Sequence, residues 1–251
     1  MTTTFADRAY LVTGAASGIG RATAEHLARH GAARLVLADR DAAALARIDL
    51  GCTIDLLPGD VADEALWAQA APVLAGIDGA VINAGVAGAG AIADLPFAEW
   101  RRILSVNLDG AFLTMRAAMR AMAGRAGAIV AVASAAGIKP EPGVAAYGAS
   151  KAGLIQMVKV AAKEGAAQRL RVNAIAPAGV ETPVWDAVPM FADRAAAIGR
   201  EAAFAELAAL ATPLGRYAKA EEIAAQIAFL LSDAAALMTG TILVSDGGYT
   251  L

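Results

Sequence analysis

Tyr147 and Lys151 stand four residues apart in the sequence. If residues 147–151 begin a helix, the phenol and the ammonium group share one helix face, one turn apart. A cation beside a phenol favours the phenolate, so we expect Lys151 to lower the pKa of Tyr147 from its ordinary value of about 10. A tyrosine with a lowered pKa can give or take a proton near neutral pH. The same spacing also fits a surface tyrosine that packs over a lysine stem.

A glycine-rich turn follows the first expected strand. Residues 9–13 are an apolar run, residues 14–20 read Gly14-Ala-Ala-Ser17-Gly18-Ile19-Gly20, and residues 21–30 have helical periodicity. A helix N-terminus offers free N–H groups and the positive end of the helix dipole to an anion, and glycines let the backbone approach it closely. We interpret residues 14–20 as a pyrophosphate site, although the spacing differs from Gly-x-Gly-x-x-Gly and a tight turn would explain the glycines as well.

Asp39 ends the second expected strand, 19 residues after Gly20. A carboxylate at this place accepts hydrogen bonds from the ribose hydroxyls of an adenosine and repels a 2′-phosphate, which favours NAD over NADP. Arg40 follows directly and can hold a phosphate, so NADP stays open as the less favoured cofactor. The alternative role for Asp39 is to cap a helix over residues 42–47.

Apolar runs alternate with helical segments along the whole chain. Strands are expected over residues 9–13, 34–38, 53–57, 79–83, 128–133, 171–176 and 241–244. Uninterrupted apolar strands that alternate with helices are typical of a parallel sheet covered on both faces. We therefore predict a single α/β domain over residues 1–251, a Rossmann-type doubly wound parallel sheet of about seven strands with helices on both faces.

Residues 182–214 are the irregular part of the chain and carry Trp185, Met190 and Phe191. Ligands of such folds lie at the carboxyl ends of the strands, so we interpret this stretch as a segment that covers the substrate. An ordinary surface excursion is the alternative.

Polar side chains follow several of the expected strands. Asn83 ends the fourth strand, Ser134 follows the fifth, and a helix expected from about residue 149 to residue 167 begins near Tyr147. The carboxyl ends of parallel strands meet at one edge of the sheet, so these side chains should converge. Ser134 would then hydrogen-bond a substrate oxygen and stabilise negative charge on it. Asn107, in a long helix expected between residues 96 and 122, could fix a water that connects Lys151 to solvent, or could be a simple exposed polar residue.

Composition limits the partners and the location. The chain has 251 residues, 58% of them hydrophobic and 18% charged, with a net charge of −3 and a pI near 5.4. A large apolar core and possible apolar subunit contacts follow from this composition. The acidic balance argues against nucleic acid and anionic membranes as partners. No uninterrupted apolar span of membrane length occurs, and Met1–Arg8 lacks a basic start followed by an apolar stretch, so we expect neither a membrane helix nor a secretory signal and a cytoplasmic location by default.

The single cysteine and the two histidines carry little chemistry. Cys52 has no partner for an intrachain disulfide and is expected to be a buried, inert thiol. His26 and His30 are one turn apart on an expected helix with charged neighbours, which indicates a solvated face. No metal site is expected.

Taken together, the motifs resemble those of the short-chain dehydrogenase/reductase family over nearly the full chain. The matching stretches are Thr13-Gly14-x3-Gly18-Ile19-Gly20, Asp60-Val61, Asn83-Ala84-Gly85, Asn107, Ser134, Tyr147-x3-Lys151, Pro177 to Thr182 and Asp246-Gly247-Gly248. Their order and spacing are more specific than any one of them, and Ser134 lies 13 residues before Tyr147 as the family pattern expects. The resemblance implies Asn107, Ser134, Tyr147 and Lys151 as the catalytic group.

The resemblance also implies where a nicotinamide cofactor would lie. Asp60 and Val61 would meet the adenine, Asn83 to Gly85 would run along the cofactor, and Thr182 would lie near the nicotinamide amide. With the glycine-rich turn, the expected cofactor positions are Gly14, Ser17, Gly18, Ile19, Gly20, Asp39, Arg40, Asp60, Val61, Asn83, Ala84, Gly85, Tyr147, Lys151, Pro177, Gly179, Val180 and Thr182. Family members tend to form homotetramers through the helices that carry Asn107 and Tyr147.

Two departures from the family pattern affect the cofactor side. The usual Asn-Asn-Ala-Gly reads Ile82-Asn83-Ala84-Gly85, which removes one asparagine at the end of a strand. The usual Pro-Gly after the sixth strand reads Pro177-Ala178-Gly179, which moves the flexible residue by one position. Neither departure removes a catalytic group.

The expected function is hydride transfer between NAD and a secondary alcohol or ketone. The pocket is expected to be lined by Val86–Ala91, Ala135–Ile138 and Val180–Phe191, a mostly apolar set that favours a hydrophobic or alicyclic substrate over a phosphorylated one. One alternative is an NADP-dependent carbonyl or 3-oxoacyl reductase, in which Arg40, Arg125 or Arg169 serves a phosphate or a carrier protein. A second alternative is a dinucleotide-binding regulator without catalytic activity.

Overall fold

The computed structural model of the protein describes residues 5–251, so Met1–Thr4, at the start of the segment judged to carry no secretory signal, lie outside the described residues. Seven strands form one fully parallel sheet in the order β3-β2-β1-β4-β5-β6-β7. They are β1 (Ala9–Thr13), β2 (Arg34–Asp39), β3 (Thr53–Pro58), β4 (Gly79–Ile82), β5 (Gly127–Val132), β6 (Leu170–Pro177) and β7 (Ile242–Ser245). The predicted Rossmann-type α/β sheet is confirmed, and each expected strand agrees with the structure to within one residue at each end.

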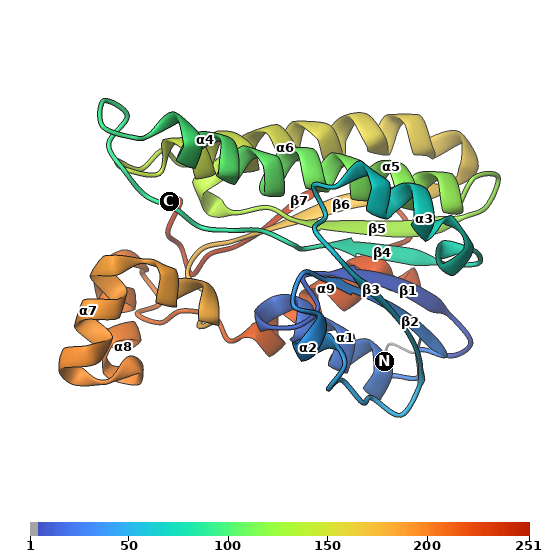
Figure 1. Cartoon of the computed structure of the whole chain (residues 1–251), viewed down its shortest axis with the longest axis horizontal. Coiled ribbons are helices and arrows are strands. Elements are labelled where there is room, and N and C mark those ends of the chain that lie inside the picture. The colour runs from blue at the N-terminus through green and yellow to red at the C-terminus, as the bar shows by residue number, and fades with distance from the viewer. Residues whose placement is uncertain (1–4) are drawn as a thin grey trace.

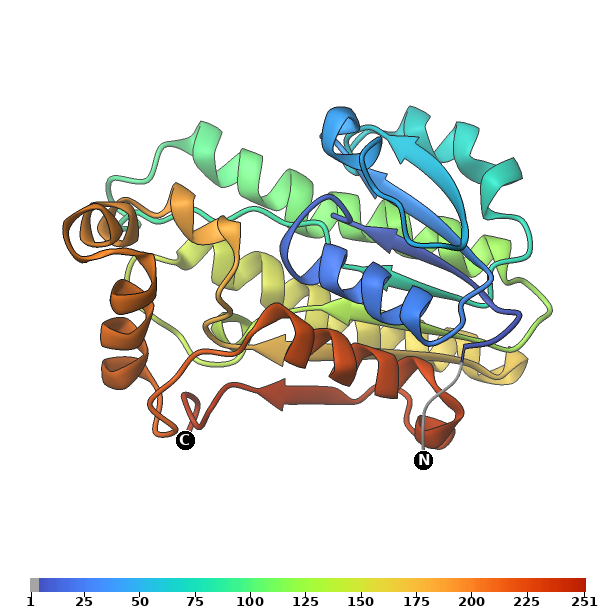
Figure 2. The same ribbon diagram turned by 90° about the horizontal axis from the view of Figure 1, so that it is seen from below.

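Helices cover both faces of the sheet (Figure 1). They are α1 (Gly18–Arg29), α2 (Ala42–Leu45), α3 (Glu64–Leu74), α4 (Phe97–Leu104), α5 (Ala111–Ala121), α6 (Ala145–Gly165), α7 (Pro189–Ile198), α8 (Arg200–Ala211) and α9 (Ala220–Leu231). Helices α3 to α6 lie on one face, and α1, α2 and α9 lie on the other, as the turned view in Figure 2 also shows.

The two faces of the sheet carry separate apolar cores, because successive side chains of a strand point to opposite faces. In β1, Leu11 packs into the core beneath α3, α5 and α6, whereas Tyr10 and Val12 pack into the core beneath α1 and α9. Every residue of β1 is therefore buried. This two-sided burial explains why the central strands have no polar alternation in the sequence.

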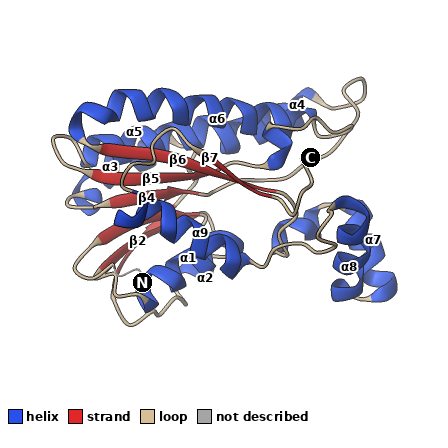
Figure 3. Ribbon diagram, turned by 180° about the vertical axis from the view of Figure 1, so that it is seen from behind, coloured by secondary structure: helices blue, strands red, loops and turns tan. Residues whose placement is uncertain are grey.

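Helices α7 and α8 stand apart from both covering layers. They lie beyond the carboxyl ends of the strands, on the side where the chain ends (Figure 3). Their side chains form a third, aromatic cluster that contains Phe191, Phe204 and Tyr217 with Trp185 packed against it. Residues 182–214 are thus more regular than the sequence indicated.

Two local expectations are wrong. Cys52 is partly exposed rather than buried, because it lies in the bend just before β3, which begins at Thr53. The helix expected between residues 96 and 122 is divided, because a π-helical turn, Ser105–Gly110, separates α4 from α5.

Helix α6 begins at Ala145, so Tyr147 lies inside its first turn. Within residues 5–251, no helix is both long enough and apolar enough to cross a membrane.

Leu27→Ala tests the core beneath α1 and α9. Leu27 is fully buried there, and truncation of a buried leucine leaves a cavity that costs about 2–5 kcal/mol of unfolding free energy. Leu210 in α8 is 83% exposed, so the matched change Leu210→Ala should alter that free energy by less than about 0.5 kcal/mol. Urea unfolding of the three proteins measures both values, and equal losses would contradict this assignment of the core.

Candidate active site

A crevice lies at the carboxyl ends of β1 and β4, where the strand order reverses, and hydrogen bonds hold these two strand ends together. The Thr13 hydroxyl accepts hydrogen bonds from the backbone N–H groups of Asn83 (3.0 Å) and Ala84 (3.1 Å). The Asn83 side-chain amide donates to the carbonyl oxygens of Thr13 (2.9 Å) and Gly14 (3.3 Å). From this point the chain continues from β1 to β2 on one side and from β4 to β5 on the other. Ligands of open parallel sheets bind at such a point. A cavity of about 790 Å³ extends from this crevice in both directions.

The glycine-rich turn is shaped by close contacts with Asn83. Gly14 has a φ of 65°, and a Cβ atom there would lie 2.7 Å from the Asn83 amide nitrogen. A Cβ atom on Gly20 would collide with the Gly14 carbonyl oxygen. Ser17 caps α1 in an extended conformation without a side-chain capping bond, and Gly18 and Ile19 line the cavity beside it. The first turn of α1 thus faces the cavity, as an anion site at a helix N-terminus requires.

One end of the cavity carries the predicted adenosine contacts. Asp39, Arg40, Asp60 and Val61 all line it. The Asp39 carboxylate accepts hydrogen bonds from the backbone N–H groups of Ala16 (2.9 Å) and Asp41 (3.0 Å), which ties the glycine-rich turn to the end of β2. The alternative in which Asp39 caps the next helix is wrong, since the Asp41 carboxylate accepts the capping bond from the Ala44 N–H at 2.8 Å.

Ser134, Tyr147 and Lys151 line the other end of the cavity. Ser134 caps the 3₁₀ turn Ala135–Gly137 (η2), and its hydroxyl accepts a hydrogen bond from the Ala136 N–H at 3.2 Å. This turn packs directly on α6, because a Cβ atom on Gly137 would lie 2.8 Å from the Lys151 carbonyl carbon. The close approach between η2 and α6 therefore brings the serine hydroxyl to the tyrosine phenol.

Burial dominates the acid–base properties of the tyrosine and the lysine. Lys151 is 4% exposed, its ammonium donates to the Val132 carbonyl oxygen at 2.8 Å, and burial lowers its pKa to about 8. Burial raises the pKa of Tyr147, and the hydrogen bond from Ser134 to the phenol offsets part of that rise. The Lys151 nitrogen lies 5.7 Å from the centroid of the Tyr147 ring. The expectation that Lys151 sets a lowered pKa for Tyr147 is wrong for the chain alone, because burial disfavours the phenolate and the ammonium is turned toward Val132.

Asn107 is buried in the π-helical turn, so its interpretation as an exposed polar residue is wrong. Its side-chain oxygen accepts from the Val86 N–H at 2.8 Å, and its amide donates to the Val86 carbonyl at 3.0 Å and to the Ser150 hydroxyl at 3.2 Å. Ser150 in turn donates to the Tyr147 carbonyl at 2.7 Å. Asn107 therefore joins the loop after β4 to the first turn of α6, a role that its spacing in the sequence did not indicate.

Pro177, Gly179, Val180 and Thr182 line the cavity after β6. Gly179 packs against the ring of Tyr217 with no room for a side chain, so the glycine in this shifted position serves a close contact. On the opposite side, Ile82 replaces the usual asparagine and is buried in β4, so that Asn83 is the asparagine whose side chain binds the Thr13–Gly14 turn.

The half of the cavity in which we expect the substrate agrees in part with the expected lining. Val86 to Ala89, Ala135 and Ala136 line it, and so do Val180 and Thr182–Trp185, with Val188 and Met190. Phe191 does not, since it is fully buried within the aromatic cluster. Sequence reasoning missed a further set, namely Pro142, Val144, Tyr217 and Tyr249, whereas Ala211 lies within the segment 182–214 that was expected to cover the substrate. Of these, Tyr249 could have been predicted from the sequence, because it directly follows the motif Asp246-Gly247-Gly248.

A family model described as enoyl-(acyl carrier protein) reductase matches residues 14–250. The chain belongs to the short-chain dehydrogenase/reductase family. It is 42% identical to cis-4-hydroxycyclohexanecarboxylate dehydrogenase of Sinomonas cyclohexanicum, over 98% of each chain. It is 35% identical to the 3-oxoacyl-[acyl-carrier-protein] reductase of Thermotoga maritima, over 96% of this chain and 97% of that protein.

Solved structures agree with this assignment. The crystal structure of a short-chain type dehydrogenase/reductase from Mycobacterium marinum superimposes with a TM-score of 0.86 at 33% identity, over 98% of this chain and 97% of that one. The protein is therefore an oxidoreductase of a family that uses a nicotinamide dinucleotide.

The residues around the cavity fit such a cofactor. Gly14 and Gly20 leave a backbone cradle that a Cβ atom would close, at the free N-terminus of α1. A carboxylate that can accept from ribose hydroxyls, Asp39, lines one end, and the phenol of Tyr147 lines the other. Of the described residues that line the cavity, the basic ones are Arg40 and Lys151.

Lys151→Met tests the burial of the ammonium group through the pH dependence of stability. The pKa of Lys151 is about 8 in the folded chain against an ordinary 10.5, so between these values the unfolded chain binds more protons at this residue. The free energy of unfolding of the wild type should therefore rise with pH across this window relative to the variant, by up to about 3 kcal/mol. Urea unfolding of both proteins at a series of pH values measures the difference. A difference that is constant with pH would show that the lysine is not desolvated.

Proposed function

We propose that the protein is an NAD-dependent oxidoreductase that interconverts a secondary alcohol and a ketone. The observation that carries the proposal is the arrangement of one cavity, with Asp39 at one end and Ser134, Tyr147 and Lys151 at the other. Such an arrangement suits hydride transfer, because a dinucleotide that spans the cavity presents its nicotinamide to the side chains that handle the substrate oxygen. A bound nicotinamide supplies or accepts the hydride.

In this proposal the chain's own residues handle the proton. Tyr147 is the general acid in ketone reduction, and burial suits it to this role because it keeps the phenol protonated near neutral pH. Ser134 orients the phenol and binds the same substrate oxygen, on which negative charge develops. Lys151 contributes a positive charge behind the phenol and a donor toward the nicotinamide ribose. Asn107 holds the loop after β4 against α6 and thereby keeps Tyr147 in place.

The substrate that fits best is an apolar, alicyclic alcohol or ketone. The substrate half of the cavity is lined mostly by small apolar side chains and by the rings of Trp185, Tyr217 and Tyr249. Flat aromatic walls suit a ring-shaped substrate, and no basic side chain other than Lys151 is among the described residues that line this half. The activity named for the relative from Sinomonas, on a hydroxylated cyclohexane carboxylate, supports the same class.

We extend the proposal to a homotetramer that uses the helices on the α4–α6 face. Phe112 in α5 is 48% exposed and Val160 in α6 is 45% exposed, and large apolar side chains at such positions are typical of subunit contacts. Residues 182–214 are proposed to cover the substrate, since Thr182–Trp185, Val188, Met190 and Ala211 line the cavity.

The affinities for NADH and NADPH test the cofactor preference. The Asp39 carboxylate would repel a 2′-phosphate, so NADH should bind at least about tenfold more tightly than NADPH. Asp39→Ser removes the repulsion and leaves Arg40 beside the phosphate, and it should reduce or reverse this ratio. Fluorescence titration of both cofactors measures the four dissociation constants. Tighter binding of NADPH by the wild type would favour the NADP-dependent carbonyl or 3-oxoacyl reductase.

Tyr147→Phe tests the proton transfer. Loss of the phenol should lower kcat by about two to four orders of magnitude, the usual contribution of general acid–base catalysis, while NADH binding changes little. The rate of ketone reduction and the dissociation constant of NADH give the two readouts. Unchanged turnover in the variant would exclude Tyr147 as the acid. A wild type that binds NADH but lacks any turnover would favour the dinucleotide-binding regulator.

A further inference from the structure

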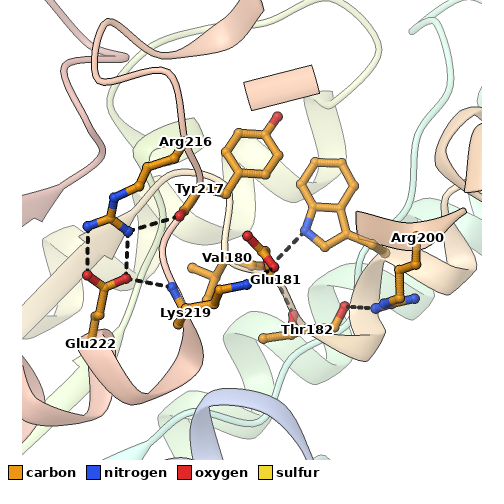
Figure 4. Close-up of polar contacts among 9 residues, drawn as sticks. Val180, Glu181, Thr182, Arg200, Arg216, Tyr217, Lys219 and Glu222 are labelled. Atoms are coloured by element: carbon orange, nitrogen blue, oxygen red, sulfur yellow. Dashed lines mark hydrogen bonds and ion pairs between the residues drawn. The ribbon is translucent and has the colours of Figure 1, made fainter. Parts of the chain in front are cut away.

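The segment that contains α7 and α8 leaves and rejoins the rest of the chain at one narrow neck. The Glu181 N–H donates to the Ala218 carbonyl at 2.9 Å, and the Ala218 N–H donates to the Gly179 carbonyl at 3.0 Å. An ion pair between Lys219 and Glu181 reinforces this pairing (Figure 4). The two ends of the segment are thus fixed to each other, and the Leu214 N–H donates to the Gly247 carbonyl at 3.1 Å just after α8. The placement of residues 183–211 depends further on contacts inside the segment.

Aromatic packing continues from the neck into the segment. The indole of Trp185 donates to the Val180 carbonyl at 2.9 Å and stacks on the ring of Tyr217, with 5.5 Å between ring centroids. Tyr217 packs on Gly179. Both rings line the substrate half of the cavity, so the neck also forms a wall of the site.

Arg200, the first residue of α8, reaches back to the neck. Its guanidinium donates to the main-chain carbonyl of Thr182 at 2.8 Å (Figure 4) and forms an ion pair with Asp186. It also lies over the rings of Phe191 and Phe204, 5.3 and 5.1 Å from their centroids. One side chain therefore joins α8, the aromatic cluster, the turn Pro183–Ala187 (η4) and Thr182, the N-cap residue of η4.

Thr182, whose carbonyl accepts the hydrogen bond from Arg200, lies on the side of the cavity where we place the cofactor. A Cβ atom on Gly18 would lie 3.4 Å from the Thr182 side chain, so Thr182 packs directly over the glycine-rich turn. Thr182 is buried, and its hydroxyl donates to the Val180 carbonyl at 3.3 Å. Thr182 is the N-cap residue of η4, so a contact that fixes its main-chain carbonyl lies between η4 and the first turn of α1.

We propose that Arg200 is a positioning residue for cofactor binding, which holds Thr182 over the glycine-rich turn through its main-chain carbonyl. This inference rests on the proposed function, since it takes the cavity beside Gly18 as the dinucleotide site. The Asp186 ion pair contributes little by itself, because both side chains are about half exposed, 43% and 58%. The hydrogen bond to the Thr182 carbonyl and the contacts with the rings of Phe191 and Phe204 are therefore the interactions through which Arg200 acts on cofactor binding.

Arg194 provides a matched control within the same helical pair. Its guanidinium binds the Glu206 carboxylate at 2.6 Å and so joins α7 to α8, and its side chain is as exposed as that of Arg200. No contact between Arg194 and Thr182 is found within the described residues. Arg194→Leu thus removes a comparable ion pair without touching the cofactor side.

Arg200→Leu should raise the dissociation constant of NADH about tenfold, the usual effect of losing a hydrogen bond from a charged donor, whereas Arg194→Leu should leave it within about twofold. Arg200→Lys keeps the charge and a donor, should give an intermediate constant, and serves as the test if the leucine variant does not fold. Fluorescence titration of NADH and the KM and kcat of each variant are the readouts, and KM for the cofactor should change more than kcat. Limited proteolysis of the cofactor-free proteins should cleave residues 183–211 faster in Arg200→Leu than in Arg194→Leu.

Equal dissociation constants in the wild type and both leucine variants would overturn the role of Arg200 and leave the proposed function intact. Equal losses of NADH affinity in both leucine variants would also overturn it, because they would reflect general loosening of the α7–α8 pair. A wild type that binds no NADH would overturn the proposed function, and the inference about Arg200 with it.

Discussion

The hydrogen bonds between Thr13 and Asn83 are the constraint on which the rest of the site depends. They hold the ends of β1 and β4 together at the point where the chain turns away in opposite directions, and they fix the glycine-rich turn through the Gly14 carbonyl. The cavity lies here because the chain leaves β1 and β4 toward opposite faces of the continuous sheet. Because Ile82 is buried in the sheet, Asn83 is the strand-end asparagine that binds the turn, and the Ala84 N–H adds a bond to the Thr13 hydroxyl.

Burial, more than the proximity of opposite charges, sets the chemistry at the other end of the cavity. Lys151 loses most of its hydration and its pKa falls, while Tyr147 stays protonated because its phenolate would be desolvated. The hydroxyl of Ser134 is the group that acts against this tendency. The three side chains meet because two glycines, Gly137 and Gly148, let η2 and α6 approach each other closely. Sheet topology, helix packing and acid–base chemistry are therefore linked through a small number of backbone contacts.

The sequence predicts the sheet well because buried parallel strands carry uninterrupted apolar runs that local patterns reveal. It also gives the positions that line the cavity at the strand ends, such as Asp39 and Ser134, since topology brings those ends together. The direction in which the pKa of Tyr147 shifts cannot be predicted from the sequence, because desolvation depends on packing from distant segments. Tyr217 and Arg200 were missed for a similar reason, since their roles arise from contacts across the neck and between α8 and η4 that have no local signature. The π-helical turn at Asn107 likewise reflects tertiary bonds to Val86 and Ser150.

In the proposed reaction, a nicotinamide bound in this cavity exchanges hydride with an apolar cyclic substrate, and Tyr147 transfers the proton. The most direct measurement is turnover of the wild-type protein on a panel of alicyclic secondary alcohols with NAD and of the matching ketones with NADH, followed by the absorbance of NADH. The account predicts formation or consumption of NADH with at least one alicyclic pair, and weaker turnover of phosphorylated alcohols. If the protein binds NADH but transforms no member of the panel, or transforms only phosphorylated or carrier-linked substrates, the account is contradicted.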